Sequence, residues 1–151
     1  MNVSVRPPVS EVLAAVREVY ADLAKRPIER QCVNRTDCCR FRLTGRMPNL
    51  TWPEALYAAR GMRAVGRKKL PAAPDGACPL LESGTGRCTI YEHRPMGCRT
   101  HFCKPAGGPY ARGEVRDLIQ RLEDLGSRLG KPGASGLTSI MPEALLVNTK
   151  N

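Results

Sequence analysis

Seven cysteines in two clusters constrain this chain more than any other feature. Three lie within eight residues, and four follow at short spacings among glycines and prolines: Cys32, Cys38, Cys39, then Cys78, Cys88, Cys98, Cys103. The count is odd, and the N-terminus MNVSVRPPVSEV has no apolar run typical of a signal peptide, which argues against a secreted disulfide framework. We expect a cytoplasmic protein, where clustered cysteines are more often metal ligands than disulfides.

The donor types indicate which metals such a site would take. The run CRTHFC places Cys98, His101 and Cys103 within six residues. Soft thiolates select zinc or iron–sulfur clusters over magnesium or calcium, but these spacings do not choose between the two. We predict an iron–sulfur cluster, of the 4Fe–4S type, with zinc as the alternative. The candidate ligands are the seven cysteines and His101.

The rest of the chain predicts a mainly α-helical single domain, residues 1–151, with an irregular cysteine-rich middle and little sheet. Apolar residues recur at helical spacing in two stretches, and a capping box with proline starts a third helix. The expected helices cover 10–25 with Ser10 as the cap, 51–64, 114–129 with Gly130 as the stop, and a short one at 142–147 with Pro142 near its start. We also expect a strand-like piece over 88–91. Because aromatic residues make up only 5% of the chain, we expect a thin apolar core that a metal supplements.

A net charge of +10, from 24 Lys and Arg against 14 Asp and Glu, is typical of proteins with acidic partners. However, a thiolate-bound metal centre carries about two negative charges, so part of the excess arginine can compensate that centre. The stretch 60–69 has five cations and no acid, yet no aromatic residue accompanies it, and stacking on single strands is therefore unsupported. We expect no nucleic-acid partner, and no apolar stretch approaches the roughly 18 residues of a membrane span.

The second half of the chain closely resembles the YkgJ-like cysteine-cluster family, also called the CxxCxxCC domain. The shared features are Cys78-Pro79 with apolar residues after it, and the run GRCTIYEHRPMGCRTHFC from Gly86 to Cys103. The resemblance extends from Cys32 to Cys103 and implies zinc or iron chelation; relatives include a methyltransferase described with a four-iron cluster. This chain departs from the family pattern at Arg35, which stands where the family has a second cysteine.

The resemblance and the residues leave several roles open. The favoured one is a cysteine-ligated iron–sulfur protein in electron transfer, in sensing, or as the accessory partner of another protein. The alternatives are a structural zinc domain and a metalloenzyme whose metal has an open position because Arg35 is not a ligand; no catalytic residue is assigned. We interpret Tyr91, Arg94 and Arg99 as residues that pack or hydrogen-bond across the metal loop, and His93 as a surface residue or local hydrogen-bonding partner.

Overall fold

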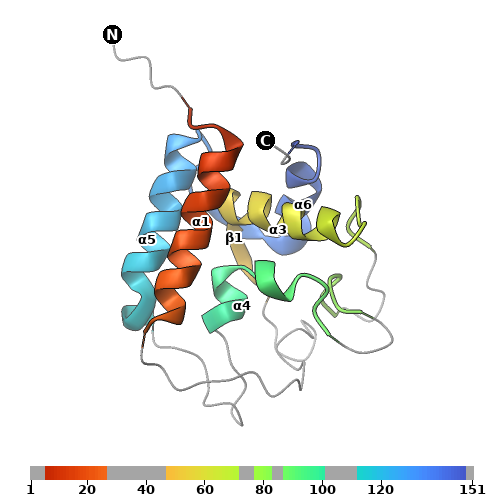
Figure 1. Cartoon of the computed structure of the whole chain (residues 1–151), viewed down its shortest axis with the longest axis horizontal. Coiled ribbons are helices and arrows are strands. Elements are labelled where there is room, and N and C mark those ends of the chain that lie inside the picture. Colours follow the sequence, from red (N-terminus) through yellow and green to blue (C-terminus); the bar gives the residue numbers. More distant parts are fainter. Residues whose placement is uncertain (1–5, 27–46, 72–76, 83–86, 101–111, 149–151) are drawn as a thin grey trace.

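The computed structural model is mainly α-helical, as predicted, and describes residues 6–26, 47–71, 77–82, 87–100 and 112–148. Two long helices, α1 (Val9–Ala24) and α5 (Arg112–Arg128), run side by side in opposite directions (Figure 1). Helix α3 (Trp52–Ala64) starts beside α1, extends to the right of the pair in this view and packs on α6 (Leu137–Ala144). The described chain therefore forms a layer of two helices packed on a second pair.

A two-stranded antiparallel sheet joins the start of α3 to the start of α6. Strand β1 (Asn49–Thr51) pairs with β2 (Ala134–Gly136) in the register Asn49↔Gly136, Leu50↔Ser135 and Thr51↔Ala134. Each strand leads directly into a helix, so the pairing fixes where α3 and α6 begin relative to one another. The sequence did not predict either strand, because each has only three residues and β2 lies in a glycine-rich stretch.

Two helix boundaries follow the predicted local signals. Thr51 caps α3, with Pro53 in the first turn and the Glu54 carboxylate returning to the Thr51 N–H, as in a capping box. Gly130 has φ of +76°, a conformation that glycine adopts without steric cost. The N–H of Lys131 then donates to the carbonyl of Gly126 at 3.0 Å, which satisfies a carbonyl at the end of α5.

The apolar core is larger than the low aromatic content predicted. Helices α1, α3, α5 and α6 all contribute fully buried aliphatic side chains, among them Leu13, Met62, Leu118, Leu122, Met141. Tyr20 and Tyr57 are the aromatic residues buried in the described core. The expectation of a thin core is therefore wrong for the described helices, because leucine, valine, alanine and methionine occupy the space that larger rings fill elsewhere.

The structure corrects several predicted boundaries. Helix α1 begins at Val9 after Pro8, so Ser10 lies inside the helix and is not its cap. Helix α6 begins at Leu137, and Pro142 lies inside it instead of near its start. The 88–91 piece is a single β-bridge at Cys88 followed by a turn and the 3-10 helix η2 (Tyr91–His93).

A short helix, α4 (Met96–Thr100), lies in the cysteine-rich middle, which was predicted to be irregular. Pro95 directly precedes it, and proline is well suited to a helix start, where a missing N–H costs nothing. Figure 1 shows α4 beneath β1. No helix of the described ranges is both long and apolar enough to cross a membrane.

Candidate metal centre

Cys78 and Cys88 lie on the two sides of one small hairpin-like unit. The N–H of Leu81 donates to the carbonyl of Cys78 at 3.1 Å, closing a turn, and Leu81 pairs with Cys88 in an antiparallel bridge. Two further bonds hold the unit: Thr89 donates its N–H and its hydroxyl to the carbonyl of Leu80 at 2.8 and 2.9 Å. Cys78 is buried in the apolar core and Cys88 is half-buried against it. This unit therefore anchors two predicted ligands to the helical core.

Cys98 lies in the middle of α4, after a tightly bonded approach. The N–H of His93 donates to the carbonyl of Ile90 at 2.7 Å, and the N–H of Cys98 donates to the carbonyl of Pro95 at 3.0 Å. Pro95 is fully buried and the Cys98 side chain is half-buried. The backbone of the third described cysteine is thus fixed by its neighbours on the N-terminal side.

Arg99 places a half-buried cation next to Cys98 in the sequence. Its guanidinium lies 3.9 Å from the ring centroid of Tyr20 and donates to the carbonyls of Arg94 and Glu92, both at 2.7 Å. Burial, the largest cause, lowers the pKa of Arg99, but a guanidinium stays protonated in proteins. Arg94 in turn lies 3.8 Å over the ring of Tyr91 and bonds its carbonyl. These contacts agree with the interpretation that Arg94 and Arg99 pack and hydrogen-bond across the loop.

His93, interpreted as a surface residue or a local hydrogen-bonding partner, is half-buried and packs against α3. Its ring lies 4.6 Å from that of Tyr57, and its Cβ and Cγ lie 2.7 Å from where a side chain at Gly61 would begin. Burial, followed by the charges of Arg60 and Arg99, lowers the pKa of His93, which favours the neutral ring. It fastens η2 to α3.

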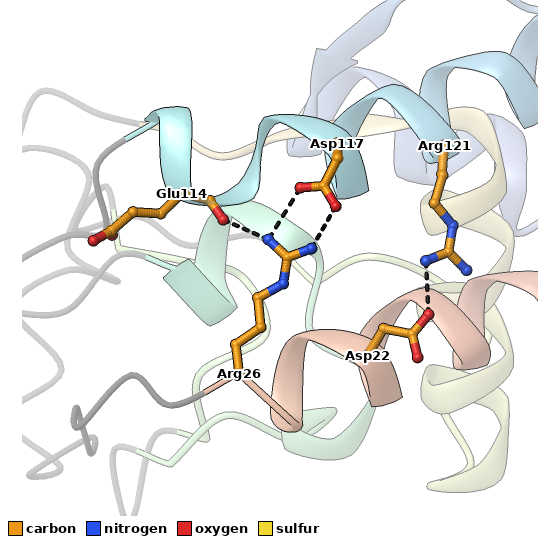
Figure 2. Close-up of polar contacts among 5 residues, drawn as sticks. All are labelled: Asp22, Arg26, Glu114, Asp117 and Arg121. Atoms are coloured by element: carbon orange, nitrogen blue, oxygen red, sulfur yellow. Dashed lines mark hydrogen bonds and ion pairs between the residues drawn. The ribbon is translucent and has the colours of Figure 1, made fainter.

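The described ends of two cysteine-bearing segments come together beside α4 and the first turns of α5. Arg26 follows α1 and precedes segment 27–46, which carries Cys32, Cys38 and Cys39. Its guanidinium pairs with both carboxylate oxygens of Asp117 in α5, at 3.0 Å to Oδ1, and donates to the carbonyl of Glu114 (Figure 2). One turn further along, Arg121 of α5 bonds Asp22 of α1 at 2.7 Å.

These ion pairs hold Arg26, which precedes segment 27–46, against the first turns of α5, the helix that follows segment 101–111 in the sequence. The other end of segment 27–46 leads into Met47 and Pro48. Pro48 lies beside α4, because a Cβ at Gly97 would be 3.6 Å from the Cβ of Pro48. Segment 101–111 itself leaves from the end of α4. The fold therefore brings the flanks of both segments to the neighbourhood of Cys98.

Not every predicted ligand can be placed. Cys32, Cys38, Cys39, His101 and Cys103, together with Arg35, lie outside the described residues. Within the described ranges, no three His, Cys, Asp or Glu side chains form a group able to hold a metal ion. No disulfide joins one of the described cysteines, Cys78, Cys88 and Cys98, to another. The ligand set is therefore a prediction, because the three described cysteines do not form a metal site by themselves.

Two residues that organise this region were not identified from the sequence as parts of the site. Arg26 follows α1 as an ordinary charged residue, and no sequence signal pairs it with a carboxylate 91 positions away. Glu54 carries a clear signal, the capping box, but that motif accounts only for its bond to Thr51. Its remaining contacts depend on the tertiary fold.

A comparison with protein families supports the metal-binding interpretation. The model of one family, CxxCxxCC, described as "Putative zinc- or iron-chelating domain", matches residues 30–116, more than half of the chain. All eight candidate ligands lie inside the matched range. Searches of curated proteins and of solved structures found no match.

Proposed function

The chain belongs to the CxxCxxCC family, and from this membership we propose that its cysteines hold an iron–sulfur cluster of the four-iron type, used in electron transfer, in sensing, or in support of a partner protein. Of the predicted ligands, Cys98 is the one whose surroundings are best described. The remaining thiolates would come from Cys78 or Cys88 and from the segments that carry Cys32, Cys38, Cys39 and Cys103. When bound, such a cluster supplies a one-electron redox centre.

The observation that carries this proposal is that described residues flanking two cysteine-bearing segments lie at α4. Cys98 lies on α4, Pro48 at the end of segment 27–46 packs beside Gly97, and segment 101–111 begins where α4 ends. Arg26 ties the start of the first segment to the helix that follows the second. Four or more thiolates from separate segments can meet only if the fold brings those segments together, and the contacts of their described flanks support such a convergence.

The charges beside Cys98 suit an anionic centre. The Arg99 guanidinium is half-buried, and its described partners are an aromatic ring and two carbonyls, without a carboxylate in contact. Partial burial of a cation carries a desolvation cost unless an opposite charge compensates it. A four-thiolate cluster carries about two negative charges, so the cluster and Arg99 would stabilise one another.

The half-buried position of Cys88 and Cys98 supports a role in electron transfer or in assisting a partner protein. Both side chains are half-buried, and that of Cys88 packs against the apolar core. A centre held there would be close enough to the surface to exchange electrons with a docked protein, while the core holds its inner side. An enzymatic role would additionally need a substrate pocket at the metal.

Anaerobic purification of the full chain tests the proposal. We expect brown protein with a broad visible absorbance and about four iron and four acid-labile sulfide per chain. Cys98→Ser should lower both contents several-fold, whereas the neighbouring control Thr100→Ser, which keeps the hydroxyl that bonds the Met96 carbonyl, should retain them. Colourless protein with stoichiometric zinc would show that the cysteines hold zinc instead of a cluster. Protein without either metal would refute metal binding.

A further inference from the structure

The only fully buried charged residue of the described core is Glu54, in the first turn of α3. Its side chain is 2% exposed, and carboxylates are almost never this buried unless they are paired or hydrogen-bonded. No cation is in contact with Glu54 among the described residues; its contacts are hydrogen bonds to neutral groups. Burying a carboxylate without a cation costs desolvation free energy, which its hydrogen bonds must offset. The partners in those bonds therefore indicate what Glu54 does.

The two carboxylate oxygens of Glu54 have different partners. Oε2 accepts from the N–H and the hydroxyl of Thr51, both at 3.0 Å, and so serves the start of its own helix. Oε1 accepts from the Tyr20 hydroxyl of α1 at 3.0 Å and from the N–H of Met96 at 2.6 Å. A capping box requires only the first set. The second set joins α1, α3 and α4 at one atom.

The bond to Met96 bears directly on the cysteine helix. Met96 is the first residue of α4, two positions before Cys98. A helix of five residues is too short to be stable alone, and its first N–H groups have no partner inside the helix. The Glu54 carboxylate supplies that partner from a rigid element, so it fixes both the position and the direction of the start of α4.

Tyr20 provides a second connection between the same elements. Its hydroxyl donates to Glu54, its ring lies 5.5 Å from that of Tyr57, and the guanidinium of Arg99 covers it at 3.9 Å. Burial, the largest cause, raises the pKa of Tyr20, as does the charge of Glu54, so the phenol keeps its proton and remains a donor. Residues on both sides of Cys98 are therefore held by this buried pair: Met96 by Glu54 and Arg99 by Tyr20.

We propose that Glu54 is a positioning residue of the metal centre: it holds the α4 backbone, through the Met96 N–H, where Cys98 can ligate. This inference rests on the proposed metal-binding function. Glu54 acts through α4 and touches neither the cysteine nor a metal. Positioning of this kind determines how tightly a metal is held, because outer contacts that orient ligands commonly change affinity by about 10- to 100-fold.

Replacing Glu54 by Gln is a sharp test because glutamine cannot reproduce the four bonds. Each carboxylate oxygen accepts from one backbone N–H, that of Thr51 or that of Met96. A glutamine side chain offers one oxygen and one NH₂ group. In either orientation its NH₂ would face a backbone N–H, so one of the two anchored segments must lose its acceptor.

The experiment compares full-length protein, purified anaerobically, with three variants: Glu54→Gln, Tyr20→Phe and the control Thr51→Val. Thr51→Val removes a hydroxyl donor from the same carboxylate, but at Oε2, away from α4. Two rates are measured: amide hydrogen exchange in peptides covering 96–100, with α5 peptides as reference, and metal release to a chelator in excess. We expect Glu54→Gln to raise both rates about tenfold, with exchange in α5 unchanged, and Tyr20→Phe to raise them less.

Thr51→Val should leave both rates within about twofold of wild type. If exchange in α5 rose together with exchange in 96–100, or if Glu54→Gln released metal no faster than Thr51→Val, Glu54 would be a structural residue only and the inference would be wrong. Wild-type protein that carries neither iron nor zinc would overturn the proposed function, and this inference with it. The wild-type metal content therefore separates the two failures.

Discussion

Replacing Gly61 by Ala should loosen the attachment of η2 to α3. A Cβ built at Gly61 would lie 2.7 Å from both Cβ and Cγ of His93. His93 Cβ is next to the backbone, so it cannot swing aside, and η2 would have to move by several tenths of an ångström. Overpacking of this kind costs about 1–3 kcal/mol, whereas Gly→Ala in a helix gains roughly 1 kcal/mol. We therefore expect a net loss of about 0–2 kcal/mol.

A second helical glycine serves as a control that separates the contact with His93 from the gain in helix propensity on Gly→Ala substitution. Gly113 lies in α5, and a Cβ there would meet nothing within 4 Å, so Gly113→Ala should gain up to about 1 kcal/mol. The free energy of unfolding, measured by chemical denaturation with far-UV circular dichroism, should be about 1–3 kcal/mol lower for Gly61→Ala than for Gly113→Ala. Equal stabilities would refute the claim that the contact with His93 is what requires glycine at position 61.

Three further predictions test the fold around the site. Leu122→Ala should lower the free energy of unfolding by about 2–5 kcal/mol, because the Leu122 side chain is 1% exposed. Leu146 is 88% exposed, so Leu146→Ala should change that free energy by less than about 0.5 kcal/mol. Denaturation curves of the two variants test this, and similar losses would contradict the assigned core. Arg26→Ala should destabilise the contact between α1 and α5 measurably in low salt and less in high salt, as denaturation midpoints at two ionic strengths would show. The hydrogen bond from Arg26 lowers the pKa of Asp117. This carboxylate therefore stabilises the fold above its unfolded pKa of about 4, and the contribution is lost as pH falls through its lowered folded pKa. The stability difference between wild type and Asp117→Asn should disappear in acid, and a difference that persisted would contradict the ion pair.

The helical part of the fold could be predicted because its signals are local. Val12, Val16 and Val19 recur at helical spacing in α1, and the Thr51 and Gly130 signals mark the start of α3 and the end of α5. Such features act within a few residues, and the structure confirms them. The cap at Ser10 was wrong because a proline two positions earlier already starts the helix.

The missed features all depend on contacts between distant residues. Strand β1 pairs with β2 across more than 80 positions, and three-residue strands carry no periodicity to detect. Helix α4 forms in a glycine- and proline-rich stretch because Glu54, 42 positions away, accepts its first N–H. The sequence indicated that the cysteines belong together, but it could not show that Arg26, which precedes one cysteine-bearing segment, pairs with Asp117 of the helix that follows another.

The most direct test of the central claim is X-ray absorption at the metal edge of the anaerobically purified protein. We predict a first shell of sulfur atoms at about 2.3 Å, accompanied by iron–iron scattering if the metal is a cluster. Cys98→Ser should lose part of that sulfur shell. A first shell made only of nitrogen and oxygen atoms would contradict thiolate ligation, and with it the role assigned to the cysteines.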